Sequence, residues 1–99
     1  MKQVSFVKSN PKCGWDTSNV TDMYGMFAYS DKFNGGIGEW DTSSVTTMSD
    51  MFRGAYKFNE DIGGWDTSKV TNMEYIFRRA INFNKNYIIN WNTSNVIYK

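Results

Sequence analysis

The sequence predicts an α/β repeat solenoid of about three to four coils of 25 residues, each with a short strand and a short helix. Its tryptophans are spaced 25, 25 and 26 residues apart, and two series of phenylalanines are each spaced 25 and 25. Apolar residues within one unit recur at helical intervals. A unit this small cannot bury its apolar side alone, so we expect successive units to stack.

The repeat divides the chain at its tryptophans. Residues 1–14 form a candidate N-terminal cap segment, followed by repeats at 15–39, 40–64 and 65–90 and a truncated fourth repeat at 91–99. The third unit carries one extra residue near Tyr87. Because an extra residue flips alternate side chains in a regular strand, we expect it to lie just before a short strand, as a bulge, with Phe83 and Trp91 in register.

Each element has its own signal along the chain. Val4–Val7 is a candidate strand that caps the first coil. In the second unit the pattern i, i+3, i+6, i+7, i+10 predicts a helix of two to three turns, formed by Val45, Met48, Met51, Phe52 and Ala55.

Threonines precede this helical pattern, and a Gly-rich stretch follows it. Thr21, Thr46 and Thr71 are candidate N-caps, and Thr71 has capping-box spacing to Glu74. A short strand is predicted near Ile62–Asp66, before a turn at residues 66–68.

Equivalent positions in the units predict a layered core. The predicted core columns are Trp15, Trp40, Trp65 and Trp91, then Phe27, Phe52 and Phe77, then Phe33, Phe58 and Phe83. An asparagine follows the last column each time, and we expect a buried ladder in which it bonds backbone groups at a turn, formed by Asn34, Asn59 and Asn84. The residue after each tryptophan is Asp16, Asp41, Asp66 or Asn92, which suits a turn acceptor.

Composition narrows the possible functions. The chain has 99 residues, a formal net charge of +1, no histidine and one cysteine. It therefore lacks the commonest general base and metal ligand, and we expect no catalytic, cofactor-binding or metal site. The near-neutral charge gives no reason to expect nucleic acid as a partner, and no apolar run approaches the length of a membrane span.

The unit W-D-T-S-x-V-T-x-M-x-x-M-F-x-x-A-x-x-F-N-x-x-I-G-x resembles the repeat of about 26 residues of the BspA-like bacterial surface proteins. The resemblance covers Trp15 to Val96. It implies a leucine-rich-repeat-like architecture, a family that includes lipoproteins, and a cell-surface or secreted location, although the chain shows no export signal. It also implies adhesion through binding of host or matrix proteins, with no catalytic residues to carry over.

We therefore expect a non-enzymatic module for protein binding or adhesion. The positions that differ between units and precede the tryptophans or the predicted strands are the candidate partner surface, formed by Gly36, Glu39, Asp61, Gly64, Asn86 and Asn90. Two alternatives stay open: a structural unit that self-assembles through its open coil ends, and an ice- or carbohydrate-binding surface of stacked threonines and aromatics. The incomplete fourth coil predicts association of copies through the C-terminal end, or else that the chain is cut from a longer array.

Overall fold

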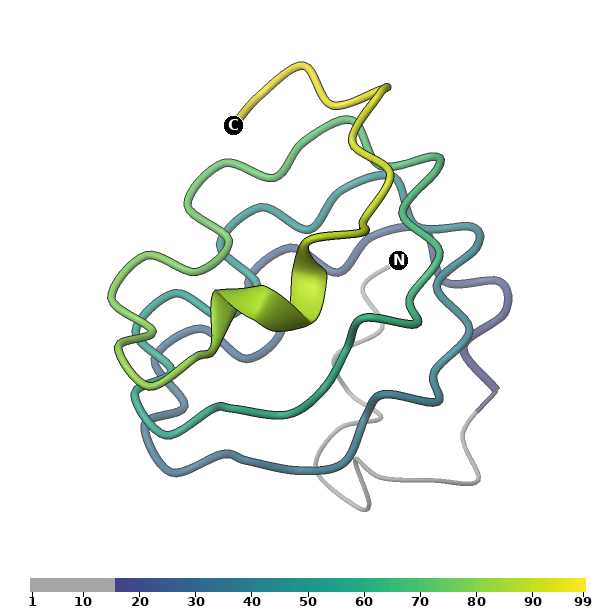
Figure 1. The fold of residues 1–99 in the computed structure, drawn as a ribbon. Helices are drawn as coiled ribbons and strands as arrows, with labels where there is room; N and C mark the ends of the chain where they lie inside the picture. The colour runs from purple at the N-terminus through teal and green to yellow at the C-terminus, as the bar shows by residue number, and fades with distance from the viewer. Residues whose placement is uncertain (1–15) are drawn as a thin grey trace.

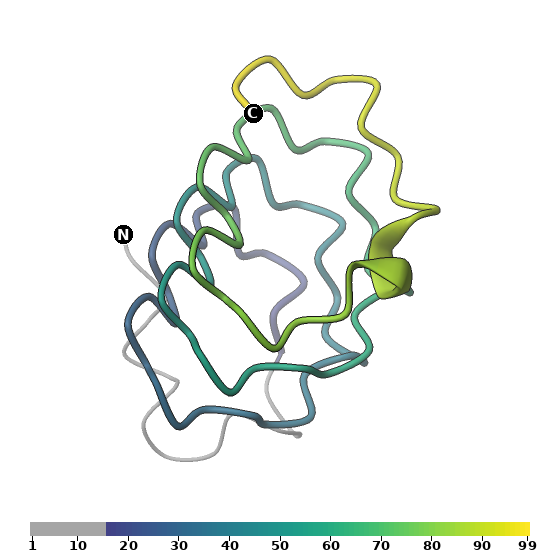
Figure 2. The same ribbon diagram turned by 60° about the vertical axis from the view of Figure 1, so that its left-hand side comes forward.

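Successive 25-residue units lie one above another in the computed structural model, which describes residues 16–99 (Figure 1). The C-terminal unit forms one end of the stack, and each lower unit follows a similar rounded path (Figure 2). Trp15 and the predicted strand Val4–Val7 lie outside the described residues.

The predicted α/β solenoid of leucine-rich-repeat type is wrong. Residues 16–99 contain no α-helix and no strand; their one regular element is the 3-10 helix η2, Lys85–Ile88. The units are joined by isolated parallel bridges, Asp22 to Thr47, Thr47 to Asn72 and Asn72 to Tyr98, and form no sheet. The radius of gyration is 12.1 Å, close to the roughly 13 Å of a compact domain of this length. The molecule is a compact globule built from stacked turns.

The predicted helix at residues 45–55 fails because its amide groups bond elsewhere. An α-helix requires each N–H to reach the carbonyl four residues before it. Here the N–H groups alternate between two partners. Those of Met51, Arg53 and Ala55 reach the carbonyl three residues back, within a turn. The others donate to carbonyls of the next unit at distances of 2.8–3.0 Å. In this set the N–H of Met48 bonds Asn72, that of Asp50 bonds Glu74, that of Phe52 bonds Ile76 and that of Gly54 bonds Arg78.

The alternation depends on two left-handed backbone positions in each unit. One is occupied in turn by Gly25, Asp50 and Tyr75, with φ values of 61°, 60° and 61°. The other is occupied by Tyr29, Gly54 and Arg79, with φ values of 60°, 71° and 65°. The two left-handed residues of each unit, four positions apart, end successive turns and prevent a helix from propagating.

The other local predictions need the same correction. No strand forms at Ile62–Asp66, where the N–H of Trp65 instead closes a turn on the carbonyl of Ile62 at 3.2 Å. The candidate N-cap threonines join units instead of capping helices: the N–H of Thr46 donates to the carbonyl of Thr21 at 2.8 Å, and that of Thr71 to Thr46 at 2.8 Å. The expected capping box with Glu74 is absent, since Glu74 N–H bonds the side chain of Asn72.

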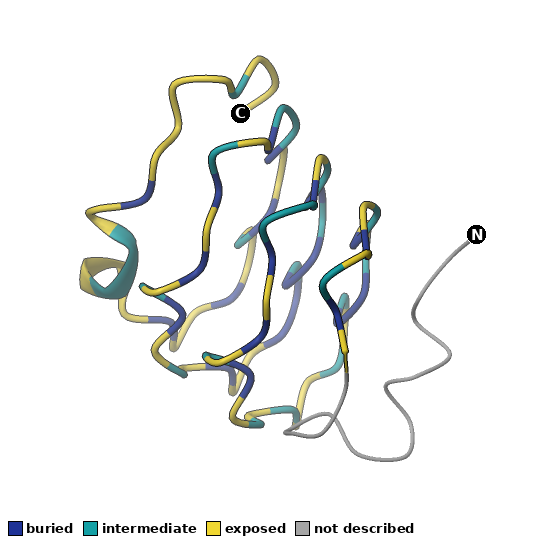
Figure 3. Ribbon diagram, turned by 90° about the vertical axis from the view of Figure 1, so that its right-hand side faces the viewer, coloured by how far each residue is buried: buried dark blue, intermediate teal, exposed yellow. Residues whose placement is uncertain are grey.

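The core runs through the inside of the stack (Figure 3). The apolar residues that predicted the helix are all buried, although they lie on turns: Val45, Met48, Met51, Phe52 and Ala55. Each unit therefore places its apolar side against its neighbours, which is where burial of apolar surface stabilises the fold.

Aromatic rings stack in columns along the core. Phe27 and Phe77 lie 5.6 Å on either side of Phe52, and Phe58 lies between Phe33 at 5.9 Å and Phe83 at 5.6 Å. The indole of Trp65 stands 6.4 Å from Trp40 and 6.2 Å from Trp91, and it donates to the carbonyl of Ile37.

The extra residue of the third unit falls in η2. A single 3-10 turn replaces the extended path of the other units, in place of the predicted bulge. Its N-cap, Asn84, accepts a hydrogen bond from the N–H of Asn86 at 3.0 Å. Phe83 and Trp91, on either side, keep their places in the aromatic columns.

Candidate functional site

The six predicted partner-binding residues are all exposed, in two adjacent rows of the stack. These residues are Gly36, Glu39, Asp61, Gly64, Asn86 and Asn90. The units approach closely here, because a Cβ on Gly38 would collide with the carbonyl oxygen of Asp61. The Asp61 carboxylate also accepts from the N–H of Gly63 at 2.9 Å. With two glycines in six positions, this surface offers few side chains to a partner.

The aspartates after the tryptophans close turns. Asp41 Oδ1 accepts from Ser43 Oγ at 2.6 Å and from Ser43 N–H at 2.9 Å, and Asp16 and Asp66 repeat the arrangement with the serine two residues on. The hydroxyl bond and then the backbone bond hold the pKa of all three carboxyls below the ordinary value. Asn92 makes the same two bonds to Ser94, so the turn does not require a charge.

The asparagines after the last Phe column link neighbouring units, but they are exposed and not buried. Asn34 Oδ1 accepts from the N–H of Asn59, and Asn59 Oδ1 from the N–H of Asn84, each at 2.8 Å. Threonine hydroxyls do the same inside the stack. Thr42 Oγ1 donates to the Asp66 carbonyl at 3.0 Å, and Thr67 Oγ1 to that of Asn92 at 2.9 Å.

A ladder of tyrosines and arginines, which sequence reasoning missed, crosses three units on the outside of the stack. The Arg53 guanidinium lies between two tyrosine rings, 6.0 Å from the centre of Tyr29 and 5.1 Å from that of Tyr75. The Arg78 guanidinium lies 5.0 Å from the Tyr75 ring centre. Tyr29 is 62% exposed and Tyr75 44% exposed, and Arg78 is exposed beside them. We call these four residues, together with the exposed neighbour Arg79, the Tyr–Arg face.

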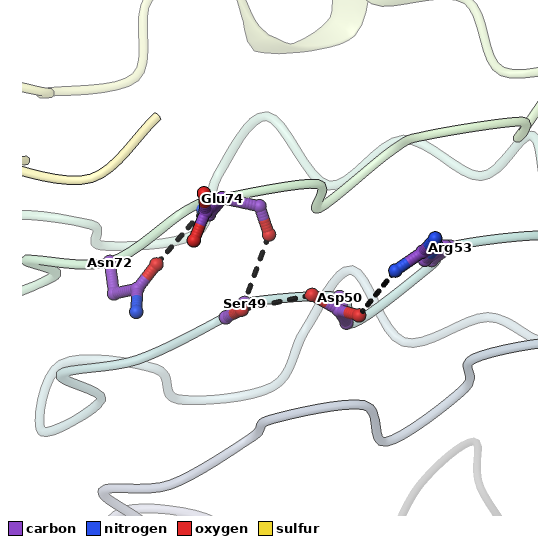
Figure 4. A network of polar contacts seen from close by, with 5 residues as sticks. All are labelled: Ser49, Asp50, Arg53, Asn72 and Glu74. Carbon is purple, nitrogen blue, oxygen red and sulfur yellow. Dashed lines mark hydrogen bonds and ion pairs between the residues drawn. The ribbon is translucent and has the colours of Figure 1, made fainter.

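Polar contacts beneath the Tyr–Arg face hold Arg53 in place (Figure 4). Its Nη1 pairs with Asp50 Oδ2 at 3.2 Å, and Asp50 Oδ1 accepts from Ser49 Oγ at 3.0 Å. Ser49 Oγ also lies 3.2 Å from the carbonyl of Glu74 in the next unit. The hydrogen bond that Arg53 donates to the Asp50 carboxylate raises the pKa of Arg53 above its ordinary value. Its Nε is buried and has no hydrogen-bond partner among the described residues.

One sequence signal could have found this face. All three arginines of the chain are Arg53, Arg78 and Arg79, at two adjacent positions of the unit, while lysines are spread along the sequence. Arginine stacks on aromatic planes better than lysine does, so its confinement to one place is informative.

The C-terminal end of the stack carries an apolar hollow of about 250 Å³. It is lined by Met73, Ile76, Thr93, Val96 and Lys99. The last residues bond the edge of the third unit, where Met73 N–H donates to the Tyr98 carbonyl at 2.7 Å. The side chains at this end are exposed, Ile97 by 70% and Tyr98 by 57%. Within residues 16–99 no backbone carbonyl accepts a hydrogen bond from the N–H of Phe77.

Among residues 16–99 no group of three or more acidic or cysteine residues is placed to hold a metal ion. In the same range no helix is long and apolar enough to cross a membrane.

Residues 2–99 match a family model described as a Mycoplasma protein of unknown function, DUF285. The chain belongs to this family. No curated protein and no solved structure matches the DUF285 chain significantly. The family description mentions neither leucine-rich repeats nor adhesion, and the fold has no repeating strand and helix, so the leucine-rich-repeat-like description is withdrawn. The resemblance to BspA-like proteins and the cell-surface or secreted location stay predictions.

Proposed function

We propose that this DUF285 chain is a non-enzymatic protein-binding module that uses its Tyr–Arg face. The observation that carries the proposal is the stack in which the exposed Tyr29, Tyr75 and Arg78 surround the half-buried Arg53. Tyrosine and arginine are enriched at the residues that dominate protein–protein binding, because they combine a large rigid surface with hydrogen-bond donors. Stacking also limits the side-chain motion that a partner would otherwise have to restrict.

The chemistry of the remaining polar groups supports binding over catalysis. The chain has no histidine, and the carboxylates of Asp16, Asp41 and Asp66 are committed to turns. A general base would need an available group with a suitable pKa, whereas hydrogen bonds hold the pKa of these carboxyls low.

The ice- or carbohydrate-binding alternative has less support. It depended on threonine hydroxyls at the surface of every coil. Thr17, Thr42 and Thr67 are buried, and their hydroxyls donate to carbonyls of the next unit. Nearer the surface, the hydroxyls of Thr46 and Thr71 also donate to carbonyls, those of the preceding unit. Self-assembly is the second candidate function, and the apolar hollow at the C-terminal end favours it.

Titration against panels of purified extracellular proteins and of glycans tests the proposal. We expect saturable binding to a protein that is weakened by Tyr75→Ala and unchanged by Tyr56→Ala, a matched control because Tyr56 is also exposed and lies outside the face. Binding to glycans alone, or to protein with equal loss in both variants, would contradict it.

A further inference from the structure

We infer that the Tyr–Arg face takes an acidic protein segment, whose carboxylates bind the guanidinium groups of Arg78 and Arg79. This inference rests on the proposed protein-binding function and names the chemistry of the partner. It is carried by three features of the face: positive charge without an ion-pair partner, a guanidinium group that lies over a tyrosine ring, and left-handed backbone at exposed side chains.

The charge on the face is only partly neutralised. Arg53 is paired with Asp50, and this is the one ion pair among residues 16–99. Arg78 and Arg79 are exposed and have no carboxylate partner in that range, since the nearby Glu74 makes no ion pair. Exposed guanidinium groups without ion-pair partners, here on two consecutive residues, are complementary to carboxylates, which arginine can bind through two parallel hydrogen bonds.

The Arg78 guanidinium already lies over an aromatic ring. It lies 5.0 Å from the ring centre of Tyr75, whose other contact is Arg53 at 5.1 Å. A stacked guanidinium keeps its N–H donors at its edge, so a carboxylate can approach without displacing the ring. The ring contact restricts the positions that the Arg78 side chain can take before binding, which reduces the entropy lost on association.

The backbone under the face is costly for these side chains. Tyr75, Tyr29 and Arg79 occupy the left-handed positions at which other units carry Gly25 and Gly54. Only glycine adopts this conformation without a steric penalty, so tyrosine and arginine here reduce stability in a place where the repeat accepts glycine. Strain of this kind is typical of residues kept for function.

Fluorescence anisotropy of a labelled oligoglutamate peptide, titrated with the full chain at low salt, tests the inference. The doubly substituted variant Arg78→Ala, Arg79→Ala should lose about tenfold or more in affinity. The control variant Lys32→Ala, Lys57→Ala removes the same charge from exposed residues outside the face and should change affinity by less than about threefold. Tyr75→Ala should weaken binding and Tyr75→Phe should restore it, because only the ring plane supports Arg78.

Each remaining outcome overturns the inference. Failure of oligoglutamate to bind excludes an acidic segment, and equal losses in the two double variants mean general charge attraction. Tighter, arginine-dependent binding of a heparin oligosaccharide points to a sulfated glycan and not to a protein. If a protein from the panel binds the parent and the doubly substituted variant Arg78→Ala, Arg79→Ala equally well, this inference is wrong and the protein-binding function still stands. If only glycans bind, the protein-binding function itself is wrong.

Discussion

Replacing Phe52 with alanine removes the ring at the centre of the aromatic stack. Phe52 is fully buried, lies 5.6 Å from both Phe27 and Phe77, and contacts Phe58 at 4.1 Å. Truncating a buried phenylalanine costs about 3–5 kcal/mol. Each stacked pair adds about 0.5–1.5 kcal/mol beyond the buried area, so we expect a loss near the top of that range, about 4–5 kcal/mol.

Urea unfolding followed by tryptophan fluorescence measures this loss. For a slope of about 2 kcal/mol/M, the midpoint should fall by roughly 2 M, and a parent stability of about 5 kcal/mol would leave the variant almost unfolded. Phe77→Ala is the matched control: Phe77 is only partly buried and has a complete unit on one side. It should cost less. A Phe52→Ala curve that overlays the parent, or a larger loss for Phe77→Ala, would refute the central position of Phe52.

Three further predictions concern the backbone, the turns and the open end. Arg79→Gly should stabilise the fold by up to about 1 kcal/mol and so raise the melting temperature, because glycine adopts the left-handed conformation without a steric penalty. Gly54→Ala should lower the melting temperature, because the new Cβ would lie 2.6 Å from the Tyr29 ring. Equal melting temperatures for the parent and both variants would contradict the left-handed backbone at these positions. The pKa of Asp41 is lowered in the fold, so its carboxylate stabilises the fold above the unfolded pKa of about 3.9, and this stability is lost as the pH falls below that value. In a plot of unfolding free energy against pH, Asp41→Asn should reduce the fall at acid pH. An unchanged fall would count against the role of this carboxylate in the turn. Light scattering over a wide concentration range should show association that Val96→Asp abolishes, since Val96 lines the C-terminal hollow; a monomer at high concentration would exclude self-assembly through this end.

The repeat period predicts neighbours well because identical residues face one another across units. Phe27, Phe52 and Phe77 could be placed in one column from their spacing alone, and the rings stand 5.6 Å apart. Spacing carries this information because a constant unit length returns the chain to the same place in each layer. The one-residue insertion does not disturb it, since η2 takes up the extra residue between Phe83 and Trp91.

The backbone path could not be predicted in the same way. An i, i+3, i+6, i+7 pattern is typical of a helix, but a run of turns that alternate inward and outward buries the same residues. The difference lies in where the N–H groups bond, and Phe52 N–H bonds to Ile76 of another unit. The spacing of apolar residues within one unit carries no information about the hydrogen bonds that the unit makes with its neighbours. Gly25 and Gly54 were the available clue, since each marks a left-handed position.

The Tyr–Arg face was missed for a related reason. Reading columns for identity favours residues that repeat, and this face is built where the units differ: Gly25, Asp50 and Tyr75 share one left-handed position. The same alternation that excludes a helix turns these side chains outward, because a left-handed residue reverses the local direction of the chain. At Tyr29, Tyr75 and Arg79 the left-handed residue carries an exposed side chain, so side chains on this face can change without altering the core. Specificity in such a stack should therefore be found at its left-handed positions and at the arginines beside them, and the invariant Trp and Phe columns should set only its stability.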